Sequence, residues 1–141
     1  MGKRYFALII GIFYVLIGIM GFIPNLVTLP AASAPPLLFN TGYGYLMGLF
    51  PINLLHNLVH LGIGIWGIIA YRSFDNSRLF CRATAIFYGL LAVMGLLPFM
   101  NTTFGVIPIF GNDVWLHAAT AIVAAYFGFI VPTAQEARAA H

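Results

Sequence analysis

The sequence predicts an all-α fold: an integral membrane four-helix bundle built from two repeated helical hairpins. The composition is the first reason, because 62% of the 141 residues are hydrophobic and only 6% are charged, whereas soluble domains carry about 25% charged residues. The second reason is a set of four apolar stretches, each close to the length of about 20 residues that crosses a bilayer. The third is an internal repeat. We therefore expect one transmembrane domain that covers residues 1–141.

The apolar stretches and the basic residues together predict a topology. The four spans are expected at about residues 5–23, 51–71, 79–98 and 113–132. All basic residues lie at one end of these spans: Lys3, Arg4, Arg72, Arg78, Arg82 and Arg138. Cytoplasmic loops are enriched in Lys and Arg, and the two connections 24–50 and 99–112 contain neither. We therefore expect a multi-pass protein whose N and C termini are both cytoplasmic.

The first span places Gly11 and Gly18 on one face, which lets a neighbouring helix approach closely. It is longer than the apolar region of a signal peptide, so we expect a retained helix. The connection over residues 24–50 starts with a proline-rich half and continues with an apolar, aromatic half. This pattern predicts a short surface helix or a cap over the outer end of the bundle. The simpler alternative is a hydrophobic loop that plugs this end.

The second span contains two histidines, His56 and His60, four residues apart. At about 100° per residue their side chains share one helical face, which continues through Gly64 and Gly67. Ionisable groups inside a span are costly and mark a functional site by default. The fourth span has the same spacing, with Asp113 and His117.

Two segments reveal the repeat: FYVLIGIMGFIP (13–24) and FYGLLAVMGLLP (87–98) are identical at six of twelve positions. Aligning His60 with His117 then pairs His56 with Asp113. A repeat that shifts by two spans relates its halves by an axis along the membrane normal. His60 and His117 should therefore face each other at one depth inside the bundle, with His56 and Asp113 one turn further out. Tyr14 and Tyr88, the matched tyrosines, should lie within reach of the histidines.

Three short motifs of this chain resemble a known family. They are GFIP at 21–24, Asn57-x-x-His60-x-x-x-Gly64, and Asp113-x-x-x-His117. Together they resemble the domain-of-unknown-function 4383 family of small four-helix membrane proteins, which is also common in photosynthetic bacteria. The resemblance covers nearly the whole chain. It implies a bacterial inner or thylakoid-type membrane and no established activity, so it assigns no catalytic residue.

The polar cluster has three interpretations. It is a hydrogen-bonded network that sets the register of spans two and four, a tetrapyrrole site, or a divalent metal site. Haem or chlorophyll would be ligated by His60 or His117, near Tyr14 and Tyr88. The flat face for such a ring, and the predicted contact between spans two and four, would be formed by the small residues Gly64, Gly67, Ala121 and Ala124. A zinc or copper ion would take His56, His60, Asp113 and His117, and the same set would suit a transport or proton-relay site.

The function that we expect is non-enzymatic: a small accessory or assembly subunit of a larger bacterial membrane complex, in some hosts a photosynthetic one. The chain lacks a nucleophile elbow, a phosphate loop and an acidic pair. Its expected partners are the lipid bilayer and a membrane complex or further copies of itself. No basic run exceeds two residues, so nucleic acid is not expected. The alternative is a redox or transport protein that binds a tetrapyrrole or metal.

Overall fold

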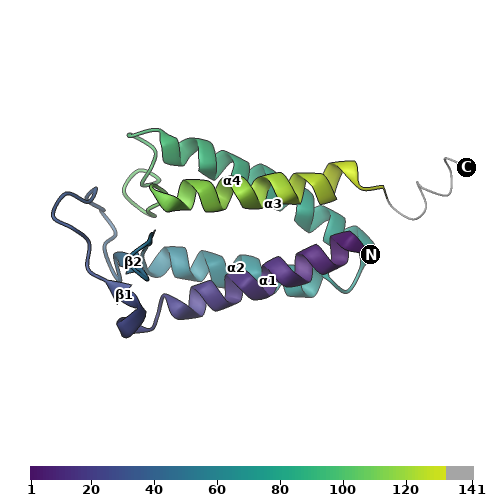
Figure 1. Ribbon diagram of the computed structural model, residues 1–141, viewed down its shortest axis with the longest axis horizontal. Helices are drawn as coiled ribbons and strands as arrows, with labels where there is room; N and C mark the ends of the chain where they lie inside the picture. Colours follow the sequence, from purple (N-terminus) through teal and green to yellow (C-terminus); the bar gives the residue numbers. More distant parts are fainter. Residues whose placement is uncertain (133–141) are drawn as a thin grey trace, which may run out of the picture.

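The computed structural model describes residues 1–132, so Arg138 and the predicted cytoplasmic tail lie outside the described residues. The fold is mostly helical. Its helices are α1 (Gly2–Met20), α2 (Leu54–Ala70), α3 (Phe74–Leu96) and α4 (Asn112–Ala125), and a π-helical turn, η2 (Tyr126–Ile130), continues α4. They form two layers, α1 beside α2 and α3 beside α4 (Figure 1).

Three of these helices are long and apolar enough to cross a membrane: α1, α3, and α4 together with η2. This indicates a multi-pass membrane protein. The helix α2 has 17 residues and is shorter than the predicted span 51–71. It is shorter because Phe50–Ile52 forms a strand, and because Asn53 then caps the helix by accepting a hydrogen bond from the His56 backbone amide at 2.9 Å.

The connection between α1 and α2 contains a small antiparallel sheet, so the all-α prediction is incomplete. Its strands are β1 (Val27–Thr28), β2 (Gly44–Leu46) and β3 (Phe50–Ile52), in the order β1-β2-β3. The connection begins with a single 3-10 turn, η1 (Pro24–Leu26), and its apolar second half forms no helix, so the short surface helix predicted there is wrong. Glycines recur through the segment, and Met47 and Gly48 both have positive φ, 52° and 71°, which turns β2 back into β3 instead of continuing a helix.

The predicted contact between spans two and four along their small residues is also wrong. A Cβ atom at Gly64 would lie 2.6 Å from the Gly11 carbonyl oxygen of α1, and one at Gly67 would lie 2.7 Å from the Ala7 carbonyl oxygen. The glycine face of α2 is therefore packed against α1. Ala121 of α4 instead packs with Tyr14 and Tyr88.

The two long connections meet at the end of the molecule opposite the N-terminus (Figure 1). The Asn53 side chain joins them, since its amide donates to the Phe39 carbonyl at 3.1 Å and to the Val106 carbonyl at 2.7 Å. The Leu38 amide adds a bond of 2.8 Å to the Gly105 carbonyl. This joined cap holds the start of α2 beside the start of α4, where the histidines lie.

Candidate functional site

The cluster consists of three imidazoles from two helices, His56 and His60 of α2 and His117 of α4. One ring nitrogen of each lies within 4.8 Å of the others. All three side chains are buried, with 3%, 2% and 0% of their surfaces exposed. The proximity of His60 and His117 expected from the repeat is thus present, and His56 lies with them: its ring centroid is 4.4 Å from that of His60.

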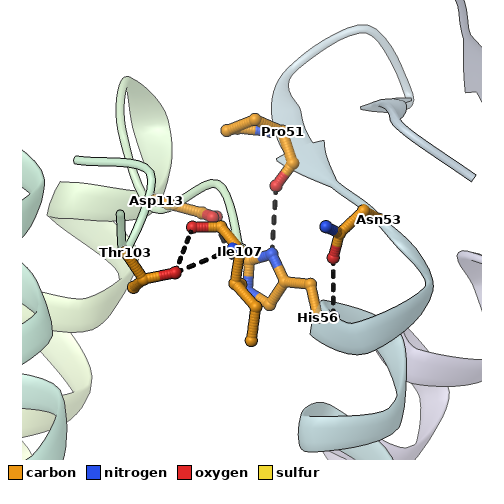
Figure 2. Close-up of polar contacts among 6 residues, drawn as sticks. All are labelled: Pro51, Asn53, His56, Thr103, Ile107 and Asp113. Carbon is orange, nitrogen blue, oxygen red and sulfur yellow. Dashed lines mark hydrogen bonds and ion pairs between the residues drawn. The ribbon is translucent and has the colours of Figure 1, made fainter. Parts of the chain in front are cut away.

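His56 is oriented by the backbone just before its own helix. Its Nδ1 lies 3.2 Å from the Pro51 carbonyl oxygen, and Figure 2 shows this contact together with the Asn53 cap. A carbonyl oxygen can only accept, so Nδ1 carries the hydrogen and a neutral ring keeps its lone pair on Nε2. In metal-ligating histidines, one imidazole nitrogen usually donates to a backbone carbonyl or a carboxylate, which leaves the other nitrogen available to the metal.

The free nitrogen of His56 faces a carboxylate. Its Nε2 lies 3.7 Å from Oδ2 of Asp113, a side chain that is 1% exposed. This separation is too long for a hydrogen bond. A nitrogen lone pair and a carboxylate oxygen are both acceptors, so the pair needs a proton or a cation between its members. Asp113 therefore belongs to the cluster, as its place in the sequence predicted.

His60 and His117 have no hydrogen-bond partner for either ring nitrogen within residues 1–132. A neutral imidazole offers one donor and one acceptor, and each buried polar group left unpaired costs about 1–3 kcal/mol. Four such nitrogens are therefore a substantial cost in the absence of a ligand. Within the described residues, the hydrogen bonds that would set the register of the helices therefore do not include these four atoms.

Two tyrosines pack beneath the imidazoles. The centroid of Tyr14 is 5.1 Å from that of His60, and the centroid of Tyr88 is also 5.1 Å from that of His117. The two phenol rings stack on each other at 5.1 Å with planes 20° apart. The Tyr14 hydroxyl pairs with the Thr120 hydroxyl at 2.8 Å rather than with an imidazole.

The residues predicted to bind a cofactor thus fall into two groups: some lie at the histidine cluster, and others lie in separate helix contacts. The structure gathers His60, His117, Tyr14 and Tyr88, with Ala121 beside the tyrosines. Gly64 and Gly67 lie against α1, and Ala124 packs in a separate cluster that contains Phe6 and Phe80. The flat surface expected for a tetrapyrrole is therefore divided among different helix contacts.

A cavity of about 380 Å³ opens onto the three histidines. Its remaining walls are Val59, Phe87, Tyr88, Leu91, Thr103, Val106, Ile107 and Ile109. The contribution of the connection between α3 and α4 to this cavity was not predicted from the sequence. The only signal there was an uncharged, apolar composition, which does not reveal that the segment folds back: the Ile109 amide bonds to the Asn101 carbonyl at 2.9 Å.

Comparison with known proteins places this site in a family context. The model of the family described as Domain of unknown function (DUF4383) matches residues 4–130, a range that contains the whole cluster. Neither a curated protein nor a solved structure matches the chain. The match covers far more than half of the sequence, and the chain therefore belongs to the domain-of-unknown-function 4383 family.

Proposed function

We propose that this protein binds a transition-metal ion, zinc or copper, at His56, His60 and His117. The observation that carries the proposal is the convergence of three buried imidazoles within 4.8 Å. Nitrogen ligands of one tetrahedral zinc ion lie roughly 3.4 Å apart, because each Zn–N bond is about 2.0–2.1 Å long. Small side-chain rotations would bring the three nitrogens to this separation. Both ring nitrogens of His60 and of His117 are unpaired, so either nitrogen of each ring could turn towards the ion.

Asp113 supplies the charge that such a site needs. Three neutral imidazoles contribute no negative charge, and an uncompensated cation in a buried site is strongly disfavoured. The carboxylate at 3.7 Å from His56 Nε2 offsets one positive charge. Three protein nitrogens leave a fourth position open, and the cavity lies beside the same three side chains.

This geometry supports a metal ion over a haem or chlorophyll. A tetrapyrrole ligated from both sides needs two opposed histidines separated by a flat gap. Here a third imidazole, His56, lies against His60, and the Tyr14–Tyr88 stack occupies the space on the other side. A ring could enter only if these side chains moved apart.

We further propose that α2 is the fourth span, that the two hairpins are a duplication, and that both termini are cytoplasmic. The N-terminus, the link between α2 and α3 and the end of α4 lie at one end of the molecule (Figure 1), as the positive-inside rule requires. The buried strand residues Pro51 and Ile52 extend the apolar length of α2. The equal Tyr14–His60 and Tyr88–His117 separations support the duplication.

The role as an accessory subunit of a larger bacterial membrane complex stays a prediction. It is compatible with metal binding. If this role is correct, protein extracted in a mild detergent should migrate on a native gel as a large species. That species should exceed the size of a monomer or small oligomer of this chain alone. Migration as that small species alone would contradict it.

Equilibrium dialysis of chelator-treated protein against Zn²⁺ or Cu²⁺ tests the metal proposal. We expect one ion per chain by elemental analysis, and a higher unfolding temperature with metal, because a ligand that binds only the folded state stabilises it. His60→Leu and His117→Leu should lose both effects, whereas Tyr14→Phe should keep them. Failure of the parent protein to bind stoichiometric metal, or normal binding by both histidine variants, would overturn the proposal.

A further inference from the structure

We infer that the cavity beside the histidines binds a neutral, bilayer-soluble molecule that has a ring-sized apolar body and a hydroxyl oxygen at one end. The molecule lies with its body among apolar side chains and its oxygen at the imidazoles. The inference does not rest on the metal, because the same free nitrogens that would ligate an ion also pair with a hydroxyl group.

The walls of the cavity determine the body of the ligand. Val59 of α2, Phe87 and Leu91 of α3, and Val106 and Ile107 of the following connection are apolar and line it. Its volume of about 380 Å³ falls within the range of roughly 300–1,000 Å³ typical of small-molecule sites. Such a space accommodates a single substituted ring.

The position of the opening determines where the ligand comes from. Phe87 and Val106 are each 40% exposed and mark the rim. Phe87 lies within a helix long and apolar enough to span a membrane, so its exposed side faces lipid. A molecule dissolved in the bilayer can therefore enter sideways between α2 and α3.

The inner end of the cavity determines the polar group. His60 and His117 are 2% and 0% exposed and present unpaired nitrogens that both donate and accept. A hydroxyl group satisfies either role, whereas a hydrocarbon leaves the nitrogens unpaired. A carboxylate is disfavoured, because none of the described residues that line the cavity is a Lys or Arg that could offset its charge.

Three fluorinated probes of matched size test the inference in chelator-treated protein reconstituted into lipid nanodiscs. The probes are 4-(trifluoromethyl)phenol, (trifluoromethyl)benzene and 4-(trifluoromethyl)benzoate, and ¹⁹F NMR measures their binding against empty nanodiscs. We expect the phenol to bind at least tenfold more tightly than the other two. His60→Leu should reduce the affinity for the phenol to the affinity for (trifluoromethyl)benzene, and should leave the latter unchanged.

A pair of variants on one helix separates the cavity from the lipid-facing surface. Val59→Trp should fill the cavity and abolish phenol binding, whereas Leu58→Trp, at a neighbouring position that is 49% exposed, should leave it intact. Equal binding of the three probes, or normal phenol binding by Val59→Trp, would overturn the inference. Val59→Trp should still take up one metal ion, so the two proposals can fail separately.

Discussion

At the scale of single residues, packing explains the glycines of two motifs, GFIP at 21–24 and Asn57-x-x-His60-x-x-x-Gly64. A Cβ atom at Gly21 would collide with the side-chain amide of Asn57, which is 2% exposed. A Cβ atom at Gly64 would meet the backbone of α1. These motif positions thus set how closely α1 approaches α2, whereas His60, in the same motif, presents unpaired nitrogens to the cavity.

The first prediction compares two glycines of α2. Gly64→Ala should destabilise the protein by about 1–3 kcal/mol, the usual cost of overpacking, because its Cβ would lie 2.6 Å from both the Gly11 carbonyl oxygen and the Val15 amide nitrogen. Gly62→Ala is the matched control, since nothing lies within 4 Å of its Cβ position. It should be neutral or stabilising by up to roughly 1 kcal/mol. Reversible unfolding in mixed micelles measures both, and equal effects would contradict the α1–α2 contact.

The second prediction concerns Asn53, whose side chain caps α2 and joins two connections. Asn53→Ser keeps a capping oxygen and loses the two amide donors, whereas Asn53→Ala loses all three bonds. Caps contribute about 0.5–2 kcal/mol, and each further hydrogen bond contributes about 0.5–1.5 kcal/mol. Stability should therefore fall in the order Asn, Ser, Ala. Ser73→Ala, at the exposed cap of α3, should lower the free energy of unfolding only by the contribution of a cap. A larger loss for Ser73→Ala than for Asn53→Ala would contradict the joining role of Asn53.

At the scale of helices, the two hairpins are joined by a shared apolar core, by ring stacking and by one buried hydroxyl pair. The core contains residues of all four helices: Phe6, Ala7, Ala70, Phe80, Cys81, Ala85 and Ala124. Tyr14 of α1 stacks on Tyr88 of α3 at 5.1 Å and bonds to Thr120 of α4 at 2.8 Å. The glycine contact, by comparison, lies within one hairpin, between α1 and α2. Each hairpin is thus packed tightly inside. The two hairpins are joined to each other by apolar, polar and aromatic side chains, and the stacked tyrosines lie next to the histidine cluster.

A double-mutant cycle tests this link as the third prediction. Tyr14→Phe and Thr120→Val each remove one hydroxyl of the pair. The sum of the two single losses in unfolding free energy should exceed the loss in the double variant. The difference, the coupling free energy, should be about 0.5–1.5 kcal/mol. Additive effects would show that the hydroxyls do not contribute to the docking of α1 on α4.

At the scale of the whole molecule, the charges and the loops divide between the two ends. The helix ends near the N-terminus carry Arg4 and Arg82, whose side chains donate to the carbonyls of Tyr71 and Gly128 at 2.7 Å and 3.0 Å. The sheet and the two uncharged connections lie at the opposite end (Figure 1). The histidine cluster lies near the uncharged end, which the proposed topology places on the outer side.

The fourth prediction tests that orientation with a membrane-impermeant thiol reagent in intact cells. The native Cys81 is buried and should stay unlabelled. Ser33→Cys, at an exposed site in the connection between α1 and α2, should be labelled from outside. Asn76→Cys, exposed at the start of α3, should be labelled only after the cells are permeabilised. The reverse pattern would place the termini outside.

The sequence by itself determined which residues share a face. Helical spacing predicted that His56 and His60 point in one direction, and the repeat predicted that His117 approaches them. Glycine content predicted where helices pack closely. These conclusions depend on periodicity, composition and the similarity of two sequence segments, all of which can be read from the chain without its tertiary structure.

Tertiary structure alone decided which neighbour each face meets. Inside a bilayer, lipid and helix surfaces are equally apolar, so hydrophobicity does not select a partner and close packing does. That is why Gly64 and Gly67 meet α1 instead of α4. The same reason applies to the cavity: its loop wall is formed by backbone hydrogen bonds such as that between Ile109 and Asn101. Every backbone has the groups for such a bond, and only the fold determines which two of them meet.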